Sequence, residues 1–129
     1  MGTKNTTLWI LQLFLGIYFV LLGSVHFVLP DGLPSVMTWM YDLGDTTHLI
    51  AGVAEILGGL GLILPSVTRI RPELTVYAAG GLIIVMIGAA IWHLTRSETS
   101  QIITNGLNIV LLAVVGYGRL RVHPITSKT

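Results

Sequence analysis

The sequence predicts an all-α fold, an integral membrane four-helix bundle with a short interfacial helix in its first outer loop. Two observations support this prediction. Of the 129 residues, 53% are hydrophobic and only 10% are charged, whereas soluble domains carry about 25% charged residues. The apolar residues also gather in four long segments, each near the roughly 20 residues that cross a bilayer as a helix. We therefore expect residues 1–129 to form a single transmembrane domain.

The four expected spans cover residues 8–29, 48–64, 73–93 and 102–120. The first apolar run exceeds the roughly 7–15 residues of a signal-peptide core, and no small-residue cleavage site follows it, so we expect a retained helix. The second span is short and is expected to end before Pro65, with a tight turn from Pro65 to Pro72. The fourth span begins with polar residues.

The longer loop between the first two spans is expected to hold the short helix. Pro30, Gly32 and Pro34 interrupt the first span. Ser35 is then expected to cap a helix that runs through Leu43. Its apolar side chains would lie on the outer membrane surface, where the helix is either a connector or a lid over a pocket.

The positive charges predict that both termini are cytoplasmic. Four spans place the N-terminus, the second loop and the C-terminus on one side, which carries Lys4, Arg69, Arg71, Arg119, Arg121 and Lys128. The other side carries only Arg96. Because Lys and Arg favour cytoplasmic loops, we expect a multi-pass protein of the plasma (inner) membrane, in contact with the lipid bilayer. The net charge of +1 excludes a strong basic field for nucleic acid.

Small and polar residues are expected to mark the packed helix faces, because helices in lipid associate through them. Glu55 shares one face with Gly52 and Gly59 by three- and four-residue spacing, so it should point into the bundle. The first span presents Gln12, Gly16, Phe19, Gly23 and His26 on one face, and the fourth presents Asn105, Asn108, Leu112, Gly116 and Arg119.

These polar residues are expected to gather in the outer half of the bundle. An ionisable residue within a membrane is costly and marks a functional site by default, so Glu55 is the first candidate. The candidate ligand-binding or proton-exchanging residues are Glu55, His26, His93, Asn105 and Asn108, with His48 and Gln12 as weaker ones. His48 is expected at the interface and Gln12 toward the cytoplasmic end. The structural alternative is that the carboxyl and amides only link helices and that the histidines are interfacial anchors.

The residue types restrict the chemistry. The chain has no cysteine, which excludes thiolate nucleophiles and thiolate-held metals within it. Glu55 with two histidines could supply ligands to Zn or Fe, or two histidines to haem, but no metal-ligand motif occurs, so a metal ion or haem is disfavoured. Phosphate-binding and serine-nucleophile motifs are also missing from the sequence, and the catalytic residues of an enzyme, if it is one, stay unassigned.

The segment GVAEILGGLGLILP, Gly52 to Pro65, resembles the second helix of the DoxX-like family of small four-helix membrane proteins. In that family a glutamate precedes a run of glycines and leucines. Nearly the whole chain agrees in outline, although His26 stands where many relatives have lysine and Gln12 where relatives often have arginine. The resemblance implies the fold. It also implies links to quinone-dependent oxidation of sulfur compounds, to oxidative-stress complexes at the membrane, or to the assembly of receptor channels.

Three functions stay open at this point. The first is an accessory subunit of a membrane redox system that binds a quinone or other small lipophile in the outer half of the bundle and works with a membrane or membrane-associated redox protein. The second is an assembly or scaffold protein for a larger membrane protein. The third is a small transporter, which would require a homo-oligomer because four short helices leave little room for a pathway.

Overall fold

The computed structural model describes residues 2–128, and this part of the chain is helical without strands. Its elements are α1 (Thr3–Val28), the 3-10 helix η1 (Ser35–Asp42), α2 (Asp45–Thr68), α3 (Leu74–Thr95), α4 (Thr99–Tyr117) and the π-helical turn η2 (Gly118–Val122). The four α-helices, with η2 continuing α4, are long and apolar enough to cross a membrane. The prediction of an all-α fold with four membrane-length helices is confirmed.

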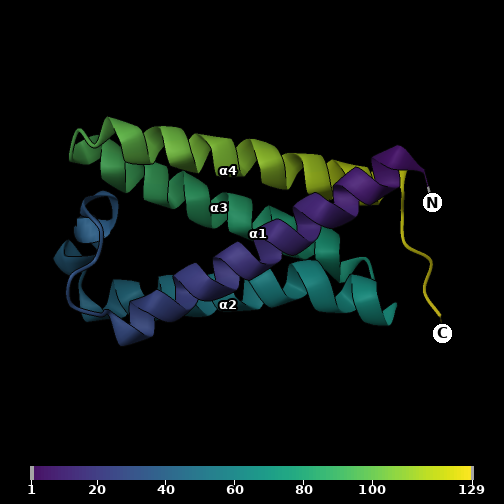
Figure 1. The fold of residues 1–129 in the computed structure, drawn as a ribbon, viewed down its shortest axis with the longest axis horizontal. Coiled ribbons are helices and arrows are strands. Elements are labelled where there is room, and N and C mark those ends of the chain that lie inside the picture. The colour runs from purple at the N-terminus through teal and green to yellow at the C-terminus, as the bar shows by residue number, and fades with distance from the viewer. Residues whose placement is uncertain (1, 129) are drawn as a thin grey trace.

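The helices lie along the long axis of the molecule and form two pairs (Figure 1). α1 packs along α2, α3 packs along α4, and α2 packs on α3. α1 runs obliquely, so that its start lies beside the end of α4 and its end lies away from it, beside the start of α2. The bundle is therefore closely joined where both termini lie and more loosely joined, between α1 and α4, toward the other end.

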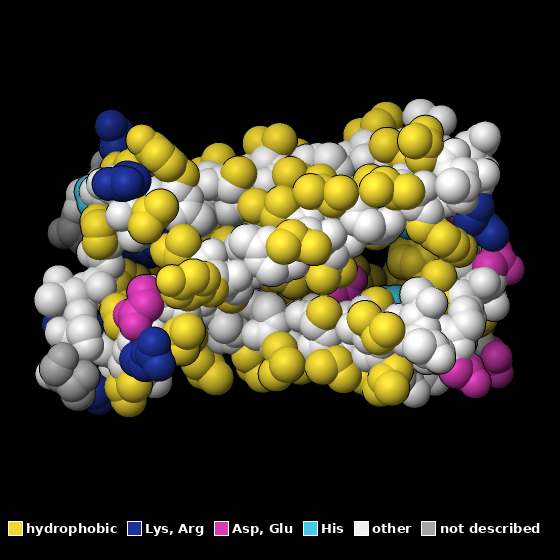
Figure 2. All heavy atoms as spheres, turned by 180° about the vertical axis from the view of Figure 1, so that it is seen from behind, with side chains coloured by type: hydrophobic (Ala, Val, Ile, Leu, Met, Phe, Trp, Pro, Cys, Tyr) yellow, Lys and Arg dark blue, Asp and Glu magenta, His cyan; other side chains and the backbone are white. Residues whose placement is uncertain are grey.

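Charged side chains separate to the two ends of the molecule (Figure 2). The end with the termini, here called the basic end, carries six of the Lys and Arg residues, and the opposite, acidic end carries Asp31, Asp42, Asp45 and Glu98 together with Arg96. Between the ends the surface is largely apolar. The core between the helices is built from Leu15, Phe19, Leu62, Ala79, Leu82, Met86, Leu112 and Val115.

Glycines let α1 and α2 approach until their backbones touch. A Cβ atom added at Gly59 would lie 2.6 Å from the carbonyl oxygen of Gly16, and one at Gly23 would lie 2.9 Å from that of Gly52. The packed face predicted for these two helices is therefore confirmed. Glycine is a poorer guide in α3, where an added Cβ at Gly81 would meet nothing within 4 Å.

The predicted turn at Pro65 is wrong, because α2 continues through this proline to Thr68. Proline lacks the N–H that would bond to the carbonyl of Gly61, and its ring crowds the preceding turn. In this turn the Gln12 side chain donates to the carbonyl oxygen of Leu62 over 2.5 Å. This bond from α1 reaches the turn of α2 that Pro65 disturbs, and bonds from neighbouring helices help membrane helices to tolerate proline.

The first loop contains the short 3-10 helix η1, and the expected cap by Ser35 is wrong. Pro34 precedes η1 without a side-chain capping bond, and Ser35 is the first residue of the helix. Met40 is fully buried, and Gln101 of α4 donates through Nε2 to the carbonyl oxygen of Val36 over 2.7 Å. η1 is thus fastened to α4 and covers the acidic end of the bundle.

Candidate functional site

Glu55 and two histidines form a buried chain of contacts between α1 and α2. His26 lies near the end of α1, while His48 and Glu55 lie two turns apart on α2. The Nδ1 atoms of His26 and His48 are 2.9 Å apart, and His26 Nε2 is 3.4 Å from Glu55 Oε2. All three side chains are less than 9% exposed. His48, which we expected at the interface, instead belongs to the buried cluster.

The two contacts of His26 use its two ring nitrogens. A neutral imidazole donates from one nitrogen and accepts at the other. His48 can therefore donate to Nδ1 of His26 while Nε2–H of His26 faces the Glu55 carboxylate. If His48 first takes up a proton at Nε2, its Nδ1 proton can pass to His26 and the Nε2 proton of His26 can pass to Glu55, which leaves both histidines neutral. The first step, from His48 to His26, follows a 2.9 Å contact, whereas the step to Glu55 would require the 3.4 Å approach of His26 Nε2 to shorten.

Glu55 also faces open space. Its Oε2 is buried and has no hydrogen-bond partner among the described residues, because the 3.4 Å approach of His26 is within ion-pair range but not hydrogen-bonded. A buried polar atom without a partner costs free energy of about 1–3 kcal/mol, more when it is charged. Such an atom beside a cavity indicates a place for a ligand.

Two cavities meet at Glu55. One, of about 480 Å³, lies between α1 and α4 under η1, and its wall includes Tyr18, Leu22, Met37, Gln101 and Thr104. The other, of about 390 Å³, lies between α2 and α3, and its wall includes His26, Ile50, Ala54, Val85 and Trp92. Both are lined by Trp39, Glu55, Ala89 and His93. Figure 2 shows the hollow between α2 and α3, toward the acidic end, with acidic and histidine side chains inside it.

His93 joins this wall through aromatic packing. Its ring centroid lies 4.8 Å from that of Trp39 and 5.0 Å from that of Trp92. Its Nδ1 is 3.3 Å from Glu98 Oε1, and Glu98 also accepts from Arg96 Nε over 2.6 Å. His93 is therefore held in place from the acidic end and presents one side of its ring to both cavities.

Asn105 and Asn108 line the larger cavity from α4. Asn108 Nδ2 makes only long contacts, 3.4 Å to the Tyr18 hydroxyl and 3.9 Å to the Met86 sulfur. The Nδ2 atom of Asn105 is buried and without a partner in the described part of the chain. The two asparagines thus make no short hydrogen bonds between helices of the kind that the structural alternative requires. Their amide groups remain able to bind a ligand.

Gln12 does not belong to this cluster. It lies at the basic end, fully buried, and its Oε1 accepts from Arg119 Nε over 2.8 Å. Sequence reasoning placed Arg119 on an inward stripe of the fourth span but counted it only as a cytoplasmic charge. The signal for its burial was that stripe, which Arg119 shares with Asn108 and Leu112.

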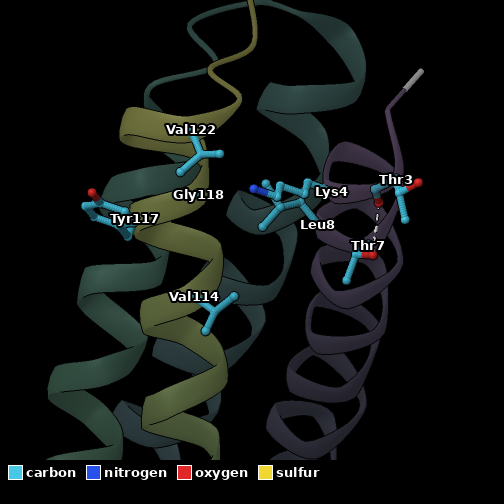
Figure 3. A pocket seen from close by; sticks show the side chains of 8 residues that line it. All are labelled: Thr3, Lys4, Thr7, Leu8, Val114, Tyr117, Gly118 and Val122. Atoms are coloured by element: carbon cyan, nitrogen blue, oxygen red, sulfur yellow. Dashed lines mark hydrogen bonds between the residues drawn. The ribbon is translucent and has the colours of Figure 1, made fainter.

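A separate groove at the basic end lies between the start of α1 and the end of α4 (Figure 3). Lys4, Leu8 and Val122 point toward its interior, and its volume is about 340 Å³. Apart from Lys4 and Tyr117 its wall has no ionisable side chain. We therefore place the candidate site at Glu55, where polar groups converge. Within residues 2–128, no three His, Asp or Glu side chains are arranged to hold a metal ion.

The comparison with protein families decides the classification of the chain. The model of the DoxX-like family matches residues 10–115, which include all four α-helices in whole or in large part. The chain belongs to the DoxX-like family. Neither curated proteins nor solved structures gave a match to this DoxX-like protein. The resemblance drawn from the Glu55 segment is confirmed, and the chain is a multi-pass membrane protein of this family.

Proposed function

We propose that this DoxX-like protein binds a quinone, or a small lipophile of similar chemistry, in the paired cavities around Glu55, as an accessory subunit of a membrane redox system. One observation carries the proposal. The buried, unpartnered Oε2 of Glu55 belongs to a side chain that lines both cavities and stands at the end of the His48–His26 chain. A carboxyl with that access and that proton supply suits a ligand that takes up protons.

The size and polarity of the cavities support a small ligand with hydrogen-bond acceptors. Their volumes, about 480 and 390 Å³, lie in the usual range for small-molecule sites, about 300–1,000 Å³. The walls are mostly apolar and aromatic. Two buried donors, Trp39 Nε1 and Asn105 Nδ2, have no partner among the described residues. A quinone offers two carbonyl oxygens to such donors and an apolar ring to Trp39 and Met86.

The proton chain would supply the protons that reduction of a quinone requires. Reduction of a quinone to a quinol takes up two electrons and two protons. Glu55 would deliver protons to a quinone oxygen and be recharged through His26 from His48. The sequence contains neither cysteine nor a recognisable electron-carrier motif, so the electrons would come from a redox partner protein. The protein is then a binding and proton-exchanging subunit rather than a complete enzyme.

The distribution of positive charge supports an orientation of the protein in the membrane. Six of seven Lys and Arg residues lie at the basic end, so that end would face the cytoplasm and the acidic end would face outward across the plasma membrane. The Glu55 site then lies in the outer half of the bilayer, and η1, with Val36 exposed, would rest at the outer interface as a cover over both cavities.

A native mass spectrum of the protein purified in mild detergent tests the binding. We expect a bound mass corresponding to a quinone, retained in Glu73→Gln and lost in Glu55→Gln with the fold intact. Glu73 is a suitable control because it lies exposed at the basic end. If Glu55→Gln kept both quinone binding and the activity of a co-purified redox partner, the proposal would be wrong.

A different result would favour the scaffold function. The protein would then carry no small molecule and would co-purify with a larger membrane protein, and Glu55→Gln would not change this. That result would assign the buried polar residues to helix packing alone.

A further inference from the structure

Arg119 is a buried cation at the basic end, remote from the Glu55 site. It lies in the π-helical turn η2 and is 4% exposed. Its Nε donates to Gln12 Oε1 over 2.8 Å, and its Nη1 donates to Asn5 Oδ1 over 2.7 Å and to the carbonyl oxygen of His123 over 3.1 Å. The guanidinium also stacks over Trp9 at 4.8 Å. All of these partners are neutral.

The charge of Arg119 has no counter-ion in the described part of the chain. The ion pairs found there involve His26, Arg71, His93 and Arg96, and none involves Arg119. Its Nη2 is buried and without a hydrogen-bond partner among residues 2–128. Burial of an unpaired charge is strongly unfavourable, and a guanidinium is satisfied by an oxyanion that accepts two parallel bonds.

Two cavities open on this guanidinium. The larger, about 480 Å³, is lined by Arg119 and Arg69 and by Asn5, Ser66 and His123, with no carboxylate in its wall. The smaller, about 250 Å³, shares Arg119 and Ser66 and adds Glu73, whose carboxylate pairs with Arg71 over 3.2 Å. The larger cavity therefore combines two cations with neutral donors.

The C-terminal segment covers this place. Pro124 and Ile125 line both cavities. Beyond them, Arg69 Nε donates to the carbonyl oxygen of Thr126 over 2.9 Å, and the Lys128 N–H donates to the carbonyl oxygen of Arg69 over 3.0 Å. The segment thus crosses from the end of α4 to the end of α2, as Figure 1 shows.

We propose that Arg119 and Arg69 bind a phosphate-bearing anion in the larger cavity. Arg119 would donate from its unpartnered Nη2, and Arg69 would contribute the positive charge of its guanidinium from the rim. The chemistry fits the headgroup of an anionic phospholipid and equally a free phosphate. This site is independent of the quinone proposal, because it lies at the opposite end of the bundle and shares no residue with it.

Thermal unfolding of the full chain in a neutral detergent, followed by tryptophan fluorescence, tests the site. The probes are inorganic phosphate and short-chain phosphatidylglycerol, with chloride at equal ionic strength and short-chain phosphatidylcholine as references. We expect a saturable rise of the unfolding midpoint with at least one probe. The apparent affinity should fall about tenfold or more in Arg119→Gln and in Arg69→Gln. A response to phosphate alone assigns a soluble anion, and a response to phosphatidylglycerol alone assigns a lipid headgroup.

Arg121→Gln is the matched control, since it removes the same charge from the same turn, and Arg121 is exposed and lines neither cavity. It should keep the response. If Arg119→Gln fails to fold, the apparent affinity of Arg69→Gln for the probes tests the site by itself. The proposal is overturned if neither probe gives a saturable rise beyond its reference, or if Arg121→Gln loses as much affinity as Arg69→Gln, which would indicate only a diffuse basic field.

Discussion

His26 is the residue on which the buried chain depends, because it contacts both Glu55 and His48. In His26→Ala, the Glu55 carboxyl and the His48 imidazole both lose their neighbour while remaining away from water. We expect a loss of about 1–3 kcal/mol in the free energy of unfolding, mainly because the buried Nδ1 of His48 loses its hydrogen-bond partner. Unfolding by denaturant in mixed micelles, followed by circular dichroism, measures it.

His123→Ala provides the comparison. The His123 side chain makes no hydrogen bond with any described residue and is only half-buried, so the same change of residue should cost little. Equal losses in both variants would show that the His26 contacts contribute nothing specific.

For single residues, the sequence predicted which side chains point into the bundle better than it predicted which side chains contact each other. Helical spacing placed Glu55, His26 and Asn108 on inward faces, and each is buried. The 2.9 Å contact of His26 with His48 was missed, because it depends on how closely α1 and α2 approach and on their relative rotation. Hydropathy contains neither quantity. The same limit concealed Arg119, whose burial depends on Gln12 and Asn5 from another helix.

Among the elements, the α1–α2 pair is in backbone contact and has little room for added volume. In Gly59→Ala the new methyl would stand 2.6 Å from a carbonyl oxygen of α1, and the backbone cannot rotate away as a side chain can. We expect a loss of about 1–3 kcal/mol from this overpacking. The matched variant Gly81→Ala meets open space and should be neutral or gain up to about 1 kcal/mol in helix propensity. Denaturant unfolding of the two variants side by side tests the contrast, and similar stabilities would contradict it.

The connection between α3 and α4 gives the acidic end a dependence on pH. A hydrogen bond from Arg96 lowers the pKa of Glu98 below its usual value of 4.5, and His93 adds to the effect. A group with a lowered pKa in the folded state contributes full stability above 4.5. That contribution shrinks as the pH falls from 4.5 and is gone below the lowered pKa. In Glu98→Gln it should be missing at every pH.

Thermal unfolding of the wild type and Glu98→Gln in detergent between neutral pH and about pH 3 checks this expectation. The wild type should be the more stable near neutrality, and the two midpoints should converge in acid. A difference between wild type and Glu98→Gln that persists in acid would show that the carboxylate charge is not what stabilises the turn.

For the whole molecule, the pattern of apolar segments was enough to predict four helices, since length and hydropathy decide which segments enter a bilayer. It could not predict the oblique path of α1, which leaves the cavity beside Glu55 between α1 and α4. It also misjudged Pro65, because a membrane helix can continue through proline where its neighbours support that turn, and here Gln12 of α1 donates to Leu62.

The separation of charge between the two ends predicts the orientation of the molecule in its membrane. Because the chain has no cysteine, a single introduced cysteine can report on one end without background. Asp31→Cys at the acidic end should react with a membrane-impermeant maleimide in intact cells, and Thr3→Cys at the basic end should react only after the membrane is opened. Both residues are exposed, so access differs only through the bilayer. The reverse pattern would place the Glu55 cavities in the cytoplasmic half of the membrane. The redox partner would then have to approach Glu55 from the cytoplasm.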